Sequence, residues 1–166
     1  AISTLGATGK EMDLSHNQMV IDFFSSFDKD SYFTIFSFLL IGTVLTFCMQ
    51  SSAALMAITM VLCSSGVLPI YMGIALVLGE NIGTTITSNI AAMGANTQAR
   101  RAALAHLTFN VFGVIWVLCI FYPFIDMVCG FVGVDPHADH IDATRLSVVL
   151  AAFHTTFNVC NTTVLI

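Results

Sequence analysis

The fold is decided by a short polar stretch, Gln50-Ser51-Ser52, set between two apolar runs. The first run, residues 32–49, is just long enough to span the roughly 30 Å of hydrocarbon in a bilayer, whereas the second, residues 53–63, is too short. Ser64-Ser65-Gly66 then indicates a turn. Two unequal arms joined by a polar tip predict a re-entrant helical hairpin over residues 32–65, with a long, tilted first arm as the alternative.

A second polar cluster, Gly79-Glu80-Asn81-Ile82-Gly83-Thr84-Thr85, interrupts the next apolar segment. Pro69 suits the first turn of that segment, and the runs on either side of the cluster, residues 70–78 and 86–93, are each too short to cross a membrane. Together they predict one broken transmembrane helix over residues 68–95. Lipid tolerates non-helical backbone only where protein buries it or where it lines a wet cavity, so two interruptions predict a solute or ion site.

The composition is that of a membrane protein. Of the 166 residues, 57% are hydrophobic and only 9% are charged, whereas soluble domains carry about a quarter charged residues. Lysine and arginine are few and form no broad basic patch (Lys10, Lys29, Arg100, Arg101 and Arg145), which excludes nucleic acid as a partner. The five cysteines lack metal-binding spacing and are interpreted as small apolar residues in packed helices.

The remaining helices are predicted from apolar length and flanking residues. Two full transmembrane helices are expected over residues 99–128 and 143–166, separated by an acidic loop around Asp139. Residues 1–30 are predicted as a linker or as an amphipathic helix at the bilayer surface, and residues 31–166 as the membrane domain. The fold class is therefore an all-α membrane protein with a re-entrant hairpin, one broken transmembrane helix and two full ones.

The charge pattern predicts how this domain is oriented. Arg100 and Arg101 open the helix that follows the broken one, and the positive-inside rule places that end in the cytoplasm. The acidic loop then faces outward and Ile166 returns to the cytoplasmic side of the plasma membrane. The chain begins with Ala1 and stops inside an apolar run, so we expect a piece of a longer protein.

The two interruptions have the chemistry to hold ions. A helix starting at Ser51 and a half-helix starting near Thr84 both point free N–H groups and the positive end of the helix dipole toward the break, which suits an oxyanion. Carbonyls freed by unwinding, together with side-chain oxygens, suit sodium. The predicted substrate- or ion-binding residues are Gln50, Ser51, Ser52, Asn81, Gly83, Thr84, Thr85 and Thr87, with sodium on Gln50, Ser51, Thr84 and Thr85.

Several other polar residues lie near these breaks. Glu80 is a carboxyl at membrane depth, where such groups are costly and usually functional, so it is placed in the cation shell or at a gate. His106 and Asn110 share a helix face, as do His154 and Asn158 in an echo of the same motif, and these four are interpreted as supports behind the site. The alternative for any single hydroxyl is a structural bond to a neighbouring helix.

These residues resemble the type II sodium/phosphate cotransporter family in its bacterial branch. That family carries a Q-S-S-S tip in each of two inverted repeats, followed by a G-x-N-I-G-T-T segment, and Gln50-Ser51-Ser52 and Gly79–Thr85 match them. Residues 99–110 and 153–158 resemble later parts of the second repeat. The third tip serine of the family is replaced here by Ala53, which removes one hydroxyl ligand.

The resemblance implies sodium-driven uptake of inorganic phosphate across the bacterial inner membrane. It also implies that the substrate is held between this repeat and the first inverted repeat of the same full-length chain. Sodium is the coupling ion and no other cofactor is expected; no nucleophile lies at a recognisable spacing from a base, so an enzyme is not predicted. Two alternatives stay open: transport of another small oxyanion, such as a carboxylate, or a membrane scaffold or sensor that does not transport.

Overall fold

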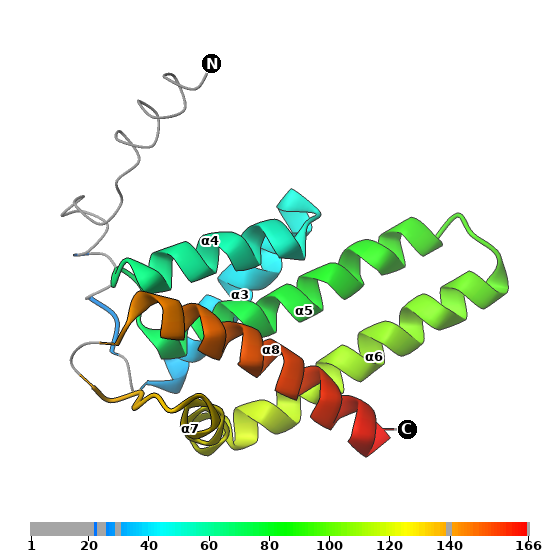
Figure 1. Cartoon of the computed structure of the whole chain (residues 1–166). Helices are drawn as coiled ribbons and strands as arrows, with labels where there is room; N and C mark the ends of the chain where they lie inside the picture. The colour runs from blue at the N-terminus through cyan, green and yellow to red at the C-terminus, as the bar shows by residue number, and fades with distance from the viewer. Residues whose placement is uncertain (1–21, 23–25, 29–30, 139–140, 166) are drawn as a thin grey trace.

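The computed structural model describes residues 22, 26–28, 31–138 and 141–165, so most of the predicted linker or surface helix over residues 1–30 lies outside the described part. The described chain is all-α, as predicted (Figure 1). Its helices, in chain order, are α3 (Tyr32–Met49), α4 (Ser52–Ser64), α5 (Ile70–Ala92), α6 (Thr97–Cys119), α7 (Phe121–Val132) and α8 (Ala143–Leu165). Within these ranges, α3, α5, α6 and α8 are long and apolar enough to cross a membrane.

The turn between α3 and α4 reverses the chain within two residues. α3 ends at Gln50, which adopts left-handed backbone angles (φ 52°) that no other described non-glycine residue adopts. Ser51 is extended, and its hydroxyl accepts a hydrogen bond from the Ala54 N–H at 3.2 Å, which caps the start of α4. A left-handed residue followed at once by an N-cap is how this sequence ends one helix and starts the next.

The tip of this hairpin lies beside α5 and short of its end. α3 runs parallel to α5, because Gly42 lies against Leu76 and Thr46 lies against Gly83. At about 1.5 Å per residue, Gly83 is about 20 Å from the start of α5, and one more turn of α3 reaches the tip. Figure 1 shows the α5–α6 hairpin continuing beyond the tip. The helical hairpin over residues 32–65 is therefore present, and because α3 is itself long enough to cross a membrane, its re-entrant placement stays a prediction.

The predicted break in the next helix is wrong, because α5 is continuous from Ile70 to Ala92. The polar side chains of this segment bond to carbonyls of the same helix instead of competing with its backbone. Thr84 Oγ1 donates to the Glu80 carbonyl at 2.9 Å, and Asn81 Nδ2 donates to the Val77 carbonyl at 3.0 Å. With those donors satisfied inside the helix, nothing draws the backbone open.

The glycines of the same segment serve close helix packing. Gly79 and Gly83 are four residues apart on the face of α5 that meets α3. A Cβ on Gly79 would collide with the backbone of Leu39, and one on Gly83 would lie 2.7 Å from the carbonyl oxygen of Thr43. Small residues at this spacing let two helix backbones approach closely in a membrane, which explains their presence without a break.

The predicted helix over residues 99–128 is two helices. α6 ends at Cys119, Ile120 leaves the helical region (φ −124°, ψ 36°), and α7 starts at Phe121. Pro123 explains the division, because its ring would clash with the Cys119 carbonyl if the helix continued, and it has no N–H to donate there. α7 then buries Phe124 on one side and exposes Asp126 and Phe131 on the other.

The bundle has two chemically distinct ends around the buried first half of α5. At one end, which we call the tyrosine end, the ring of Tyr122 lies 5.7 Å from Tyr32 and 5.3 Å from Tyr71. Tyrosines gather where a membrane meets water. At the other, the arginine end, Arg100 and Arg101 open α6, and α8 returns to it, since Leu165 lines a hollow beside Arg101.

Candidate functional site

The hairpin tip presents amide donors beside the polar segment of α5. Ser51 takes up the N–H groups of Ala54, through its hydroxyl, and of Leu55, through its carbonyl at 3.3 Å. The N–H groups of Ser52 and Ala53 lie in the first turn of α4, where a helix leaves such donors without intrahelical partners. The Gln50 side chain is exposed beside them. This end of α4 therefore has the donors and the dipole that suit an anion, and anion binding here stays a prediction.

The threonines of α5 remain able to bind a cation although the helix is unbroken. Thr84, Thr85 and Thr87 each donate a hydroxyl proton to a carbonyl of α5, at 2.9, 2.7 and 2.8 Å. A hydroxyl that donates keeps its oxygen lone pairs as acceptors. Thr85 is buried, whereas Thr84 and Thr87 are partly exposed. These oxygens could coordinate sodium without any unwinding of the backbone.

One part of the predicted site is wrong. Since α5 runs through Gly83, Thr84 and Thr85 without interruption, there is no half-helix N-terminus here and no carbonyl freed by unwinding. Of the two predicted sources of amide donors for an anion, the described residues provide the start of α4 and no half-helix in α5. The residues of α5 can contribute side-chain oxygens, and their role in binding remains a prediction.

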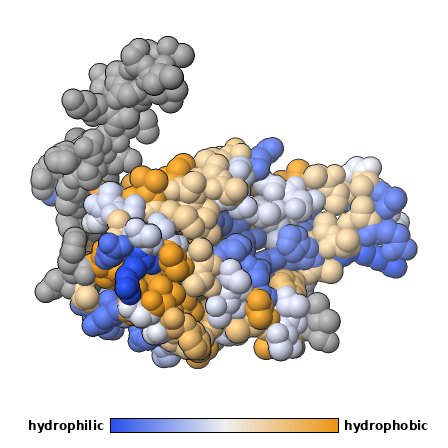
Figure 2. Space-filling model, viewed as in Figure 1, coloured by the Kyte–Doolittle hydropathy of each residue, from blue (hydrophilic) through white to orange (hydrophobic). Residues whose placement is uncertain are grey.

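The register of α3 and α5 brings the tip to the polar segment of α5. Thr46 lies against Gly83, and the two helices run parallel, so one further turn places Gln50 level with Thr87. Figure 2 shows hydrophilic residues gathered in the middle of the visible face, over α5 between α4 and α8. The two polar stretches predicted from the sequence thus lie along one stretch of the bundle, although only one of them is a break.

Glu80 is enclosed by protein. Its side chain is 1% exposed, and Thr59 of α4 donates a hydrogen bond to its Oε1 at 3.5 Å. The other carboxyl oxygen, Oε2, is buried without a hydrogen-bond partner, as is the hydroxyl of Thr46 on α3. A buried carboxyl with a free oxygen is costly at membrane depth, and this favours the predicted place in a cation shell over an exposed gate.

Thr46 and Thr59 are site neighbours that the sequence analysis missed. Both are buried and both come from the apolar arms of the hairpin. A signal was available for Thr59, which is a single hydroxyl within an otherwise apolar turn and lies seven residues after Ser52, on the same helix face.

The repeated His–Asn motif has the same local geometry in both helices. The side chain of Asn110 donates to the His106 carbonyl at 3.0 Å, and that of Asn158 donates to the His154 carbonyl at 2.8 Å. Asn110 is buried, but His106 is exposed, so the two residues that share this helix face do not both face the protein interior. The link between α6 and α8 comes instead from Asn161, which the sequence analysis missed.

Asn161 joins the two helices at a point of close approach. It is fully buried, donates to the Phe109 carbonyl at 2.9 Å and accepts from Trp116 Nε1 at 3.3 Å. It also lies against Gly113, where a Cβ would come within 2.5 Å of its side chain. Its signal in the sequence was a second asparagine on α8, three residues after Asn158.

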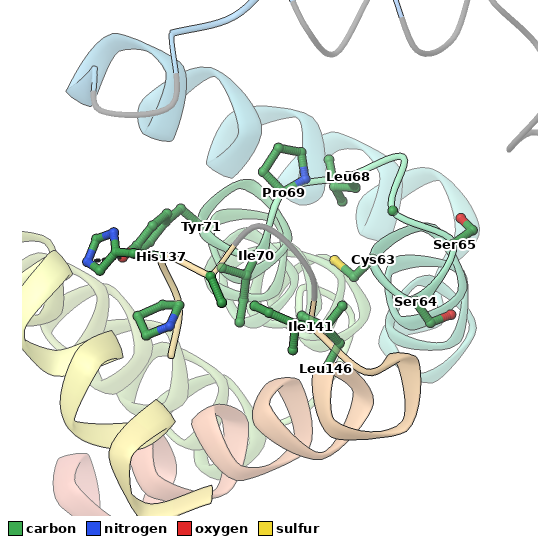
Figure 3. A pocket seen from close by; sticks show the side chains of 13 residues that line it. Cys63, Ser64, Ser65, Leu68, Pro69, Ile70, Tyr71, His137, Ile141 and Leu146 are labelled. Carbon is green, nitrogen blue, oxygen red and sulfur yellow. Dashed lines mark hydrogen bonds between the residues drawn. The ribbon is translucent and has the colours of Figure 1, made fainter. Parts of the chain in front are cut away.

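A separate hollow of about 510 Å³ opens at the tyrosine end (Figure 3). It lies between the turn after α4, the start of α5 and the loop before α8. The Tyr71 hydroxyl donates to Asp126 at 3.3 Å and lies 3.4 Å from His137 Nε2. None of the predicted site residues is among its lining residues, so this hollow is separate from the predicted site.

Comparison with known proteins gives an independent view of the chain. A sequence model described as Na+/Pi-cotransporter matches residues 17–132. The chain is similar to the uncharacterized protein YqeW of Bacillus subtilis (strain 168), with 42% identity over 96 residues that cover 58% of this chain and 30% of the relative. No solved structure matches the chain.

Two animal relatives carry descriptive names. The chain is 36% identical over 89 residues to human sodium-dependent phosphate transport protein 2B, covering 51% of this chain and 12% of the relative. It is 38% identical over 85 residues to mouse sodium-dependent phosphate transport protein 2C, covering 48% and 14%. The chain therefore spans less than a third of the length of each of these three relatives.

Proposed function

Because the chain belongs to the Na+/Pi-cotransporter family, we propose that it is one inverted repeat of a secondary transporter that takes up inorganic phosphate with sodium by alternating access. The observation that carries this proposal is the chain reversal at Gln50–Ser51, which brings the start of α4 beside the polar segment of α5. An amide-rich helix start within a membrane domain has no role in packing against lipid, but it suits an oxyanion.

The residues divide between the two charges to be carried. The N–H groups of Ser52 and Ala53, with the carboxamide of Gln50, are placed to donate to phosphate oxygens. The oxygens of Gln50, Ser51, Thr84 and Thr85 are our candidates for sodium, with Glu80 offsetting its charge. At the hairpin tip, only the start of α4 offers free backbone N–H groups. We therefore assign the second set of phosphate donors to the first inverted repeat of the full-length chain.

The orientation of the domain follows from its charges. We place the arginine end in the cytoplasm of a bacterial cell and the tyrosine end outside, so that the hairpin enters from the outer surface. Cysteine labelling of the full-length protein in intact cells tests this: a membrane-impermeant reagent should modify a cysteine placed at Ser65 and should not modify one placed at Gly94. The reverse labelling pattern would invert the topology.

Uptake by the reconstituted full-length protein tests the function. Proteoliposomes should accumulate labelled phosphate only with an inward sodium gradient, and an equal potassium gradient should give none. Accumulation of a small dicarboxylate in place of phosphate would assign the same site another cargo, because helix-start donors suit any small oxyanion. Accumulation of neither anion would favour a scaffold or sensor that does not transport.

A further inference from the structure

The arginine end carries two adjacent positive charges with no acidic residue near them in the sequence. Between Asn81 and Ile125 the chain contains no aspartate or glutamate, although its net charge is −5. Arg100 and Arg101 lie in the first turns of α6 and are both exposed. Among the described residues neither forms an ion pair. Two unopposed guanidinium groups therefore mark one end of the membrane bundle.

An apolar hollow lies next to each of these arginines. The first, of about 380 Å³, is lined by Arg100 and by apolar residues of the α5–α6 hairpin that include Ile90 and Met93. The second, of about 520 Å³, is lined by Arg101 and by apolar residues of α6 and α8 that include Phe112 and Leu165. Leu104 lines both hollows, so they lie on the two sides of one helix.

Along α6, the two arginines lie near the start of the helix, and the two apolar hollows extend from them along the turns that follow. Leu104 follows Arg100 and Arg101 by about one helical turn, which places it deeper in the bilayer between the two hollows. Leu104 is 58% exposed and Met93 is 71% exposed, so the described core does not cover these apolar side chains. A phospholipid has the matching shape, with one phosphate and two acyl chains.

We propose that the arginine end binds an anionic phospholipid, with the phosphate held between Arg100 and Arg101 and one acyl chain in the hollow on each side of Leu104. Guanidinium groups bind phosphate oxygens through paired, charge-assisted hydrogen bonds. Basic clusters beside membrane helices select anionic lipids because the membrane surface concentrates the opposite charge. An apolar protein surface in these hollows would leave both arginines unpaired. Charge complementarity therefore favours an anionic lipid as the occupant.

Lipid retention by the full-length protein tests the proposal. The protein is purified in a neutral detergent, offered phosphatidylglycerol or phosphatidylcholine, and examined by native mass spectrometry for bound lipid. The wild-type protein should retain phosphatidylglycerol in preference. The double variant Arg100→Gln/Arg101→Gln should lose about 30-fold in affinity for it, since each surface arginine contributes about a factor of five. Arg145→Gln removes one exposed arginine at the tyrosine end and should leave retention unchanged.

Two further measurements separate the phosphate from the chains. Glycerol phosphate has the same charged group without acyl chains and should not displace the lipid at equal concentration. Ala105→Phe, which fills part of the hollow beside Arg101 without altering charge, should weaken retention of the two-chain lipid more than that of its single-chain lyso form. Unchanged retention in the double arginine variant, or displacement by glycerol phosphate, would overturn the proposal. Because the readout is lipid binding, it stands apart from failure of phosphate uptake.

Discussion

Two polar stretches of this protein lie between apolar segments but have different backbone structures. At the tip, residues 50–52, the helix ends and a new one starts. In α5, residues 79–87, the helix continues. Both stretches are rich in hydroxyls or amides, and both lie at membrane depth. The difference lies in their surroundings, because Gln50 is exposed and Ser51 and Ser52 are partly exposed, whereas Gly79 and Glu80 are buried among other helices.

Small polar residues therefore do not by themselves interrupt a membrane helix. At the tip, Ser51 gives the new helix its cap, and the Gln50 N–H still bonds to the Thr46 carbonyl at 2.8 Å, so each helix keeps a backbone hydrogen bond next to the reversal while the Ser52 and Ala53 N–H groups stay available. In α5, the hydroxyls satisfy themselves on the same helix, and Gly79 and Gly83 admit the backbone of α3. The helix break at the tip depends on the Ser51 cap, whereas the close packing of α3 on α5 depends on the continuity of α5.

The largest effect is expected from removing the Gln50 side chain. Gln50→Gly should reduce sodium-driven phosphate uptake to the level of protein-free liposomes while the thermal midpoint stays equal or rises. Glycine relieves the left-handed backbone at this position but supplies no carboxamide to the site. Uptake by reconstituted full-length protein, measured beside thermal unfolding, checks both halves of the prediction.

Gln50→Asn is the matched control for that experiment. Asparagine tolerates left-handed backbone angles and keeps a shorter carboxamide, so partial uptake is expected. Wild-type uptake by the glycine variant would remove the Gln50 side chain from the transport site and leave the tip with its backbone donors alone.

A smaller effect on stability, with no direct effect on cargo, is expected in α5. Gly79→Ala should destabilise the full-length protein by about 1–3 kcal/mol, because its Cβ would force α3 away from α5. Gly130→Ala in α7 is the matched control: it is also helical, but a Cβ there meets open space, and alanine should stabilise that helix by up to about 1 kcal/mol. Equal behaviour of the two variants in thermal unfolding would contradict the packing role of Gly79.

The same contrast explains what sequence reasoning could and could not predict. The reversal at Gln50 was predictable because a serine N-cap and an apolar arm too short to span both point to it. The continuity of α5 was not, because whether a glycine opens a helix or packs against one depends on α3, which is distant in the sequence. The division between α6 and α7 could have been predicted, because Pro123 is a local helix-breaking signal. The long apolar run over residues 99–128 drew attention away from it.

The candidate site followed the same rule. Gln50 and Ser51 were identified from a motif that acts locally, through backbone and cap. Thr59 was missed because its importance comes from the buried carboxyl of Glu80 on another helix, which only the packing of α4 on α5 reveals. Local chemistry could be predicted from the chain, whereas pairs between helices required the three-dimensional arrangement.

A third prediction asks whether the hydroxyls of α5 act only inside their helix. Thr84→Val removes the hydrogen bond to the Glu80 carbonyl and should change the stability by no more than about 1 kcal/mol, the scale of a typical hydrogen bond. If the same oxygen binds sodium, the sodium concentration for half-maximal uptake should rise about tenfold, which corresponds to one lost ligand of moderate strength. Thr84→Ser keeps the oxygen and should retain the wild-type sodium dependence. An unchanged sodium dependence in the valine variant would leave Thr84 a purely structural residue.

The smallest effect is expected from Ala53→Ser, which supplies the hydroxyl that the related Q-S-S-S tip carries. Ala53 is exposed at the second residue of α4, so a serine there meets no steric barrier, and the stability should change by less than about 0.5 kcal/mol. Sodium should drive uptake at a lower concentration in this variant, because one more oxygen lies at the tip. Ala57→Ser adds the same hydroxyl one turn further along the same exposed face and should leave the sodium dependence unchanged. A matching change in both variants would show that added polarity on α4, and not a ligand at the reversal, sets the response to sodium.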